Sequence, residues 1–87
     1  MANSKFVLSA TPTAVSGLTD DAEYVFQNRT SRTLFVTQGT AADAEAALVV
    51  EPLGFVTVTK VEDEDTYAWV DRVRPGEVLH LAIAESV

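Results

Sequence analysis

Short runs of alternating apolar and polar residues, separated by turn-forming residues, recur along this chain and constrain its fold more than any other feature. An apolar residue at every second position is typical of a strand with one buried face. Val and Thr, which suit a pleated surface, supply about a quarter of the residues. The predicted strands cover residues 5–9, 13–16, 23–28, 33–38, 55–60, 66–70 and 78–84. Six or seven short strands predict an all-β fold, a small β-sandwich or jelly-roll-like barrel, as one domain over residues 1–87.

The alternation also predicts which residues face the core and how neighbouring strands connect. Leu79, Leu81 and Ile83 share one face of their strand, and His80 lies on the other. The runs at 23–28 and 33–38 are separated by five polar residues, which predicts a hairpin. The acidic run at 62–65 is interpreted as the solvated tip of another hairpin.

The segment Thr40–Val49 does not follow the strand pattern. Thr40 and Asp43 have the spacing of a capping box, and five alanines lie in or beside the segment. We expect one to two helical turns in a long loop, too short to be stable without packing. The alternative is an α+β domain in which 40–50 forms one full helix.

Size and charge exclude several classes of function. The chain has 87 residues, a formal net charge of −7, one histidine and no cysteine. An acidic chain is a poor partner for nucleic acid, and the absence of cysteine excludes disulfides and thiolate metal sites. Because so short a chain buries a small core, self-association or docking on a larger body is a natural source of extra stability.

The ends and the hydropathy of the chain give expectations about location. Residues 1–4 are expected to form a flexible tail, and residues 1–10 lack the pattern of a secretory signal. No run of 18 apolar residues is present, so no membrane partner is expected. We expect the protein to stay in the cytoplasm where it is made, or to leave only inside a particle.

No motif in the sequence indicates catalysis or a cofactor. The run at 62–65 lacks the spacing and the glycine of a calcium loop. His80 has no serine or cysteine partner signature, and no glycine-rich phosphate loop or nucleophile elbow is present. The sequence therefore predicts a protein that is not an enzyme and has no metal and no cofactor. His80 is interpreted as facing solvent or a neighbouring subunit.

Tyr67 and Trp69 share one face of the predicted strand at 66–70. If both were exposed, they would form an interface anchor or a platform for sugar stacking. If both were buried, they would belong to the core. The first case supports an alternative function, a carbohydrate- or peptide-binding module. A third hypothesis, an acidic inhibitor or DNA mimic, is disfavoured because the acids are scattered along the chain.

Residues 20–87 resemble, in outline, the small β-sandwich proteins of bacteriophage particles, which are head decoration (cement) proteins or other accessory structural proteins. The resembling segments are 24–30, 34–37, the Ala-rich 40–49, the turn 51–54 and the aromatic strand 67–70. In such proteins this turn often reads Pro-Gly, whereas here Leu53 intervenes. The resemblance implies a structural virion protein that binds the major capsid protein or another virion protein and forms a closed homo-oligomer, a trimer being one compatible order.

Overall fold

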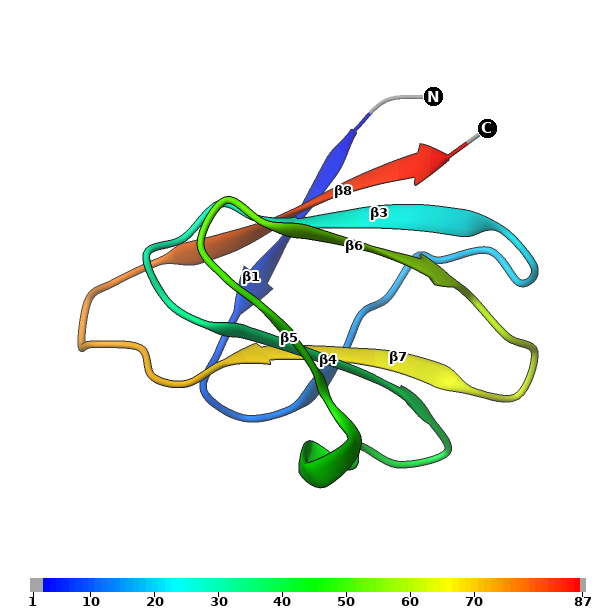
Figure 1. Ribbon diagram of the computed structural model, residues 1–87, viewed down its shortest axis with the longest axis horizontal. Coiled ribbons are helices and arrows are strands. Elements are labelled where there is room, and N and C mark those ends of the chain that lie inside the picture. Colours follow the sequence, from blue (N-terminus) through cyan, green and yellow to red (C-terminus); the bar gives the residue numbers. More distant parts are fainter. Residues whose placement is uncertain (1–2, 87) are drawn as a thin grey trace.

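The computed structural model describes residues 3–86, which form eight strands and one short 3₁₀ helix (Figure 1). The elements are β1 (Ser4–Leu8), β2 (Thr13–Ala14), β3 (Glu23–Asn28), β4 (Leu34–Gly39), η1 (Ala44–Ala46), β5 (Leu48–Val50), β6 (Phe55–Thr59), β7 (Asp65–Val70) and β8 (Leu79–Ser86). The seven predicted runs correspond to seven of these strands, which confirms the all-β prediction. β5 is the strand that the sequence pattern did not predict.

The strands form two antiparallel sheets of four strands each. The first sheet has the order β1-β8-β3-β6 and the second has the order β2-β7-β4-β5. Consecutive strands lie in different sheets at every connection except β4–β5. Each sheet is therefore assembled from strands distant in sequence, and most connections cross from one sheet to the other at an end of the molecule.

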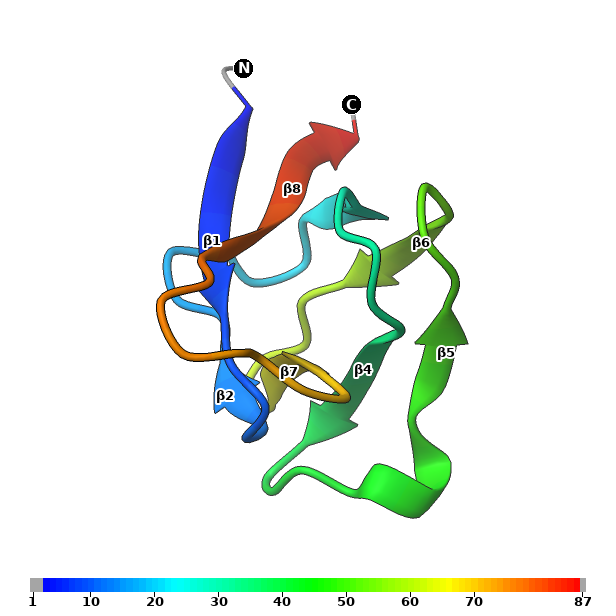
Figure 2. The same cartoon turned by 90° about the vertical axis from the view of Figure 1, so that its left-hand side faces the viewer.

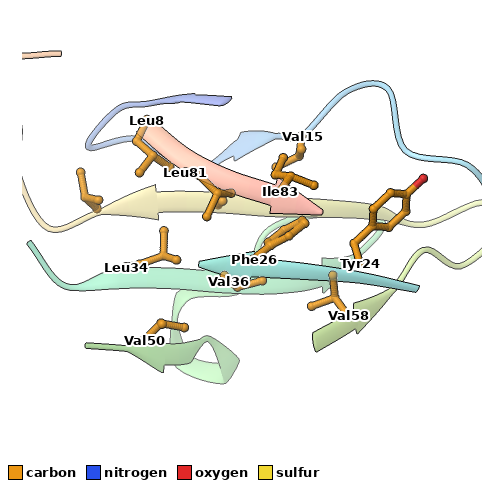
Figure 3. Close-up of a cluster of buried hydrophobic side chains, with 12 residues drawn as sticks. Leu8, Val15, Tyr24, Phe26, Leu34, Val36, Val50, Val58, Leu81 and Ile83 are labelled. Atoms are coloured by element: carbon orange, nitrogen blue, oxygen red, sulfur yellow. The ribbon is translucent and has the colours of Figure 1, made fainter. Parts of the chain in front are cut away.

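The core lies between the sheets, and both contribute to it (Figure 3). Phe26, Leu34, Leu81, Val36 and Val70 are its largest fully buried apolar side chains. The predicted shared face of Leu79, Leu81 and Ile83 is confirmed. Leu81 and Ile83 are buried, and the partly buried Leu79 packs against the same cluster.

The predicted hairpin between 23–28 and 33–38 is wrong, because β3 belongs to the first sheet and β4 to the second. The intervening link crosses between the sheets, and the buried side chain of Asn28 holds it there. The turn at 62–65 is likewise a crossing from β6 to β7 and not a hairpin tip. A polar link of five residues can form either a hairpin turn within one sheet or a crossing between two sheets. Its composition therefore did not distinguish the two connections.

The prediction of one to two helical turns in a loop at Thr40–Val49 is confirmed as a single 3₁₀ turn, although the segment also contains strand residues. Only Ala44–Ala46 is helical, and its N-cap is Asp43, whose carboxylate accepts a hydrogen bond from the Glu45 N–H. Leu48–Val50 is a strand that pairs with β4. Alanine propensity over so few residues does not nucleate a helix against strand pairing, and the α+β alternative is excluded by the same observation. Of the predicted tail at 1–4, Met1 and Ala2 lie outside the described residues, and Ser4 already pairs with Ile83.

Candidate functional site

Strand pairing gathers three loops at one end of the molecule (Figure 1). The end of β3 lies beside the start of β6 and the start of β8, since Gln27 is opposite Phe55 and Asn28 is opposite Leu81. In the second sheet Leu34, at the start of β4, is opposite Val70 at the end of β7. Loops 29–33, 51–54 and 71–78 therefore meet at this end.

We call these three loops the arginine end, because they contain all four arginines of the chain. The four are Arg29, Arg32, Arg72 and Arg74. The same loops hold three of the thirteen acids, so their formal charge is +1 although that of the whole chain is −7. Of the other ten acids, eight lie in or beside the loops at the opposite end, and Asp43 and Glu45 lie in the segment of η1. The molecule therefore has a weakly basic end and a strongly acidic end.

Asn28 builds the arginine end by hydrogen bonding two loops to one side chain. Its Nδ2 donates to the carbonyl oxygens of Arg32 at 2.7 Å and of Val50 at 3.0 Å. Its Oδ1 accepts from the backbone N–H of Thr30 at 3.0 Å and from the Thr30 hydroxyl at 2.7 Å. Asn28 is fully buried, and its amide uses both donors and both acceptor sites.

An ion pair connects two loops of this end. Nη2 of Arg32 lies 3.1 Å from each carboxylate oxygen of Glu77. The same carboxylate accepts a hydrogen bond from the backbone N–H of Arg74 at 3.1 Å. This backbone hydrogen bond, together with the charges of Arg32 and Arg74, lowers the pKa of Glu77 below its ordinary value of 4.5.

The lowered pKa of Glu77 gives an expected pH dependence. The ionised carboxylate contributes stability that is present above the unfolded-state pKa and is lost as the pH falls through the folded-state pKa. The free-energy difference between the wild type and Glu77→Gln should therefore be largest at about pH 7 and shrink by about pH 3 in urea titrations. A difference that stays constant over this range would contradict the role of the charge.

At the acidic end, Lys60 lies among carboxylates. Its Nζ donates to Oδ1 of Asp20 at 2.9 Å and to the carbonyl oxygen of Val61 at 2.9 Å. The hydrogen bond to Asp20 is the main cause that raises the pKa of Lys60, and the nearby charges of Asp65 and Asp63 act in the same direction. The lysine is thus held as a cation that partly offsets the acidic end.

A second surface lies along the side of the molecule formed by β5 and β6, opposite β1 and β2 (Figure 2). We call it the apolar edge, because five of the seven large apolar residues that are exposed among the described residues lie along it. The five are Leu48, Val49, Leu53, Phe55 and Val61. Phe55 is 68% exposed and belongs to β6, the edge strand of the first sheet. Apolar residues concentrated in this way are typical of a surface that binds another protein.

Leu53 is strained as well as exposed. The turn closes through a hydrogen bond from the Gly54 N–H to the Glu51 carbonyl at 2.8 Å. Leu53 occupies its third position with φ +66°, where a type II turn normally has glycine or asparagine. A leucine in this conformation costs about 1–2 kcal/mol. Because its side chain is 70% exposed, side-chain packing within the chain does not offset the cost, although the Leu53 N–H donates to the Asn28 carbonyl at 2.8 Å.

The outer face of the first sheet carries a shallow hollow with a volume of about 290 Å³. The small side chains of Ala82 and Ala84 on β8 leave this space, and Val25, Gln27 and Phe55 border it. The apolar edge therefore adjoins a partly apolar sheet face through Phe55.

The structure places the residues predicted as an interface on two different sheets, Tyr67 and Trp69 on β7 and His80 on β8. Tyr67 and Trp69 lie on the outer face of the second sheet, because the intervening Ala68 points into the core. Trp69 is only 7% exposed and stacks on Phe35, with ring centroids 5.5 Å apart. His80 lies on the outer face of the first sheet, opposite Val7 on β1. An interface role for these three residues stays a prediction.

Sequence reasoning missed the arginine end and the apolar edge. The arginines are spread over 45 positions, and only strand pairing brings them to one end. Leu53 did leave a signal, because an apolar residue between Pro52 and Gly54 in a turn is unusual. That signal was noted only as a departure from a family pattern.

No protein-family model, curated protein or solved structure matches this chain significantly. Among residues 3–86, no three His, Asp or Glu side chains are grouped so that they could hold a metal ion. The described part of the chain also has no helix with the length and hydropathy needed to cross a membrane.

Proposed function

We propose that the chain is a non-catalytic structural protein of a bacteriophage particle, a capsid decoration or cement protein that stabilises the shell through contacts with the major capsid protein. In this proposal the two sheets form a β-sandwich that supports binding surfaces at its end and edge. The resemblance of residues 20–87 to small virion proteins supports the phage assignment. The observation that supports binding through one end of the molecule is the separation of charge between its two ends.

The arginine end is the surface that we assign to the shell. Arginine is enriched in protein interfaces, whereas aspartate and glutamate are depleted. The molecule is 35 Å long, and charges are screened over about 8 Å at physiological salt. A partner at the arginine end therefore experiences the local positive charge and not the −7 of the whole chain. The acidic end then faces solvent, which favours solubility and discourages contact with nucleic acid.

The carbohydrate-binding alternative has less support. An open aromatic platform needs exposed rings, and Trp69 is buried against Phe35. We therefore do not assign the outer face of the second sheet to a ligand.

Co-sedimentation with capsid shells that lack this protein tests the proposal. Wild-type protein should sediment with the shells, and Arg72→Glu should weaken binding by about tenfold or more at low salt, with the difference from the wild type shrinking as salt is raised. Lys5→Glu is the matched control, because it makes the same change in net charge on β1, away from the arginine end. Wild-type protein that stays in the supernatant would overturn the proposal. Equal losses in the two variants would overturn the assignment of the arginine end.

A further inference from the structure

Two contacts fix the first half of loop 71–78, which belongs to the arginine end. The Asp71 N–H donates to the Thr33 carbonyl at 3.3 Å. Val73 is partly buried and packs against the core. The residue that precedes Pro75 is restricted by the proline ring to an extended backbone. This half of the loop is therefore held in place before any partner binds.

A tight turn fixes the second half of the loop. The Glu77 N–H donates to the Arg74 carbonyl at 3.0 Å, and the Arg74 N–H donates back to the Glu77 carboxylate at 3.1 Å. Pro75 and Gly76, whose φ is +80°, occupy the two central positions where a type II turn favours them. The same Glu77 carboxylate forms the ion pair with Arg32, so its charge is used inside the molecule.

Arg72 and Arg74 project into solvent from this fixed backbone. Both side chains are exposed, whereas Val73 between them packs against the core. This alternation is typical of an extended segment, in which side chains two positions apart share a face and their Cα atoms lie about 6–7 Å apart. Within residues 3–86 no ion pair includes either arginine. One ordered loop thus presents two neighbouring guanidinium groups that lack a carboxylate partner in this part of the chain.

We propose that Arg72 and Arg74 bind carboxylates on an acidic surface of a protein partner, one carboxylate for each guanidinium. We call these two residues the arginine pair. A guanidinium matches a carboxylate with two parallel hydrogen bonds, which adds direction to the attraction of charge. Carboxylates at alternate positions of a strand, or one turn apart on a helix, have the spacing of about 5–7 Å that the pair needs. The inference rests on the proposed function only in naming the shell as the source of these carboxylates.

The charges of the molecule favour an acidic protein surface over a nucleic acid. Binding to nucleic acid depends on a basic patch that neutralises several phosphates at once. The arginine end has a formal charge of only +1, and the two lysines of the chain lie elsewhere, Lys5 on β1 and Lys60 after β6. The arginine pair instead suits a partner with a few charges in a small area, where close charge pairs set specificity.

Titration of the isotopically labelled full chain with short poly-L-glutamate at low salt tests the arginine pair directly. The amide NMR shifts should change mainly in loop 71–78 and in the adjoining loop 29–33, and added salt should reverse the change. A short DNA duplex at the same concentration of negative charge should bind no more tightly. Shifts that are absent from loop 71–78, or tighter binding of the duplex, would overturn the inference.

Single variants identify the residues responsible. Arg72→Gln and Arg74→Gln should each weaken the binding of poly-L-glutamate by about threefold, with the wild-type melting temperature retained because both side chains are exposed. Lys5→Gln is the matched control, because it removes the same charge from β1 and should leave binding nearly unchanged. An equal loss in Lys5→Gln would show that the net charge controls binding, and the arginine pair would be discarded.

Arg74→Lys tests the bidentate geometry separately from the charge. The variant keeps the positive charge and the backbone contacts of the turn, but an ammonium group cannot make two parallel hydrogen bonds to one carboxylate. Poly-L-glutamate should therefore bind Arg74→Lys less tightly than the wild type. Equal affinity would contradict the bidentate contact at this position.

Competition on capsid shells separates this inference from the proposed function. Excess short poly-L-glutamate should displace the wild-type protein from the shells. If the protein never sediments with shells, the decoration role fails, and the NMR titration still judges the arginine pair. If the protein stays on the shells while poly-L-glutamate saturates it, the shell contact does not use the arginine pair. The inference is then overturned, whereas the decoration role stands.

Discussion

Replacing Asn28 with alanine is expected to lower the free energy of unfolding by about 3–5 kcal/mol. The substitution removes four hydrogen bonds, so the Val50 carbonyl and the Thr30 N–H lose this partner, while the Arg32 carbonyl keeps its hydrogen bond from the Thr30 hydroxyl. Each buried polar group that loses its partner costs about 1–3 kcal/mol. Because small domains have about 5–15 kcal/mol of stability, this one change removes a large share. Urea denaturation followed by circular dichroism measures the loss.

Two further variants isolate the cause. Asn3→Ala makes the same chemical change at an exposed position and should alter the free energy of unfolding by less than about 0.5 kcal/mol. Asn28→Asp keeps the shape and the acceptor oxygen but loses both donors, so it should also be strongly destabilising. If Asn28→Asp is as stable as the wild type, the hydrogen bonds to Arg32 and Val50 are not the source of the stability.

Replacing Trp69 with alanine is expected to cost about 3–5 kcal/mol, as for other buried large aromatic residues. The ring is 7% exposed and stacks on Phe35 with an angle of 23° between the ring planes. The tryptophan emission of the folded protein should therefore lie at shorter wavelength than that of indole in water. Unfolding of the wild type in denaturant can be followed by this emission. The variant lacks the only tryptophan, so its unfolding is followed by circular dichroism.

A double-mutant cycle separates stacking from burial. Trp69→Ala and Phe35→Ala together should cost less than the two single losses added, with a coupling of about 0.5–1.5 kcal/mol. If Trp69→Ala instead costs less than about 1 kcal/mol and the emission resembles free indole, the ring is exposed in solution. That result would return Tyr67 and Trp69 to consideration as a binding platform.

The structure separates residues that stabilise the fold from residues that do not. Asn28 and Trp69 both stabilise the fold, one by hydrogen bonds between loops and the other by packing on an outer sheet face. Leu53 and Phe55 do neither, since both are mostly exposed. Residues that cost stability or contribute little to it are the better candidates for contact with a partner.

The alternation of side chains determined most of the fold. The pattern in β8 predicted that Leu79, Leu81 and Ile83 share one face, because a strand places successive side chains on opposite faces whatever its neighbours are, and all three pack in or against the core. Turn composition likewise predicted where strands end. β5 was missed because Leu48–Val50 has no alternation to detect and follows an alanine-rich segment.

Only the tertiary structure decided which strands are neighbours. The pairing of β3 with β8 joins residues more than 50 positions apart, and no local pattern specifies such a partner. The arginine end and the apolar edge both depend on that choice, since each gathers residues from different connections. Local preferences set the direction of each side chain, but the burial of all the inward faces together selects the arrangement, and surface sites arise from that arrangement.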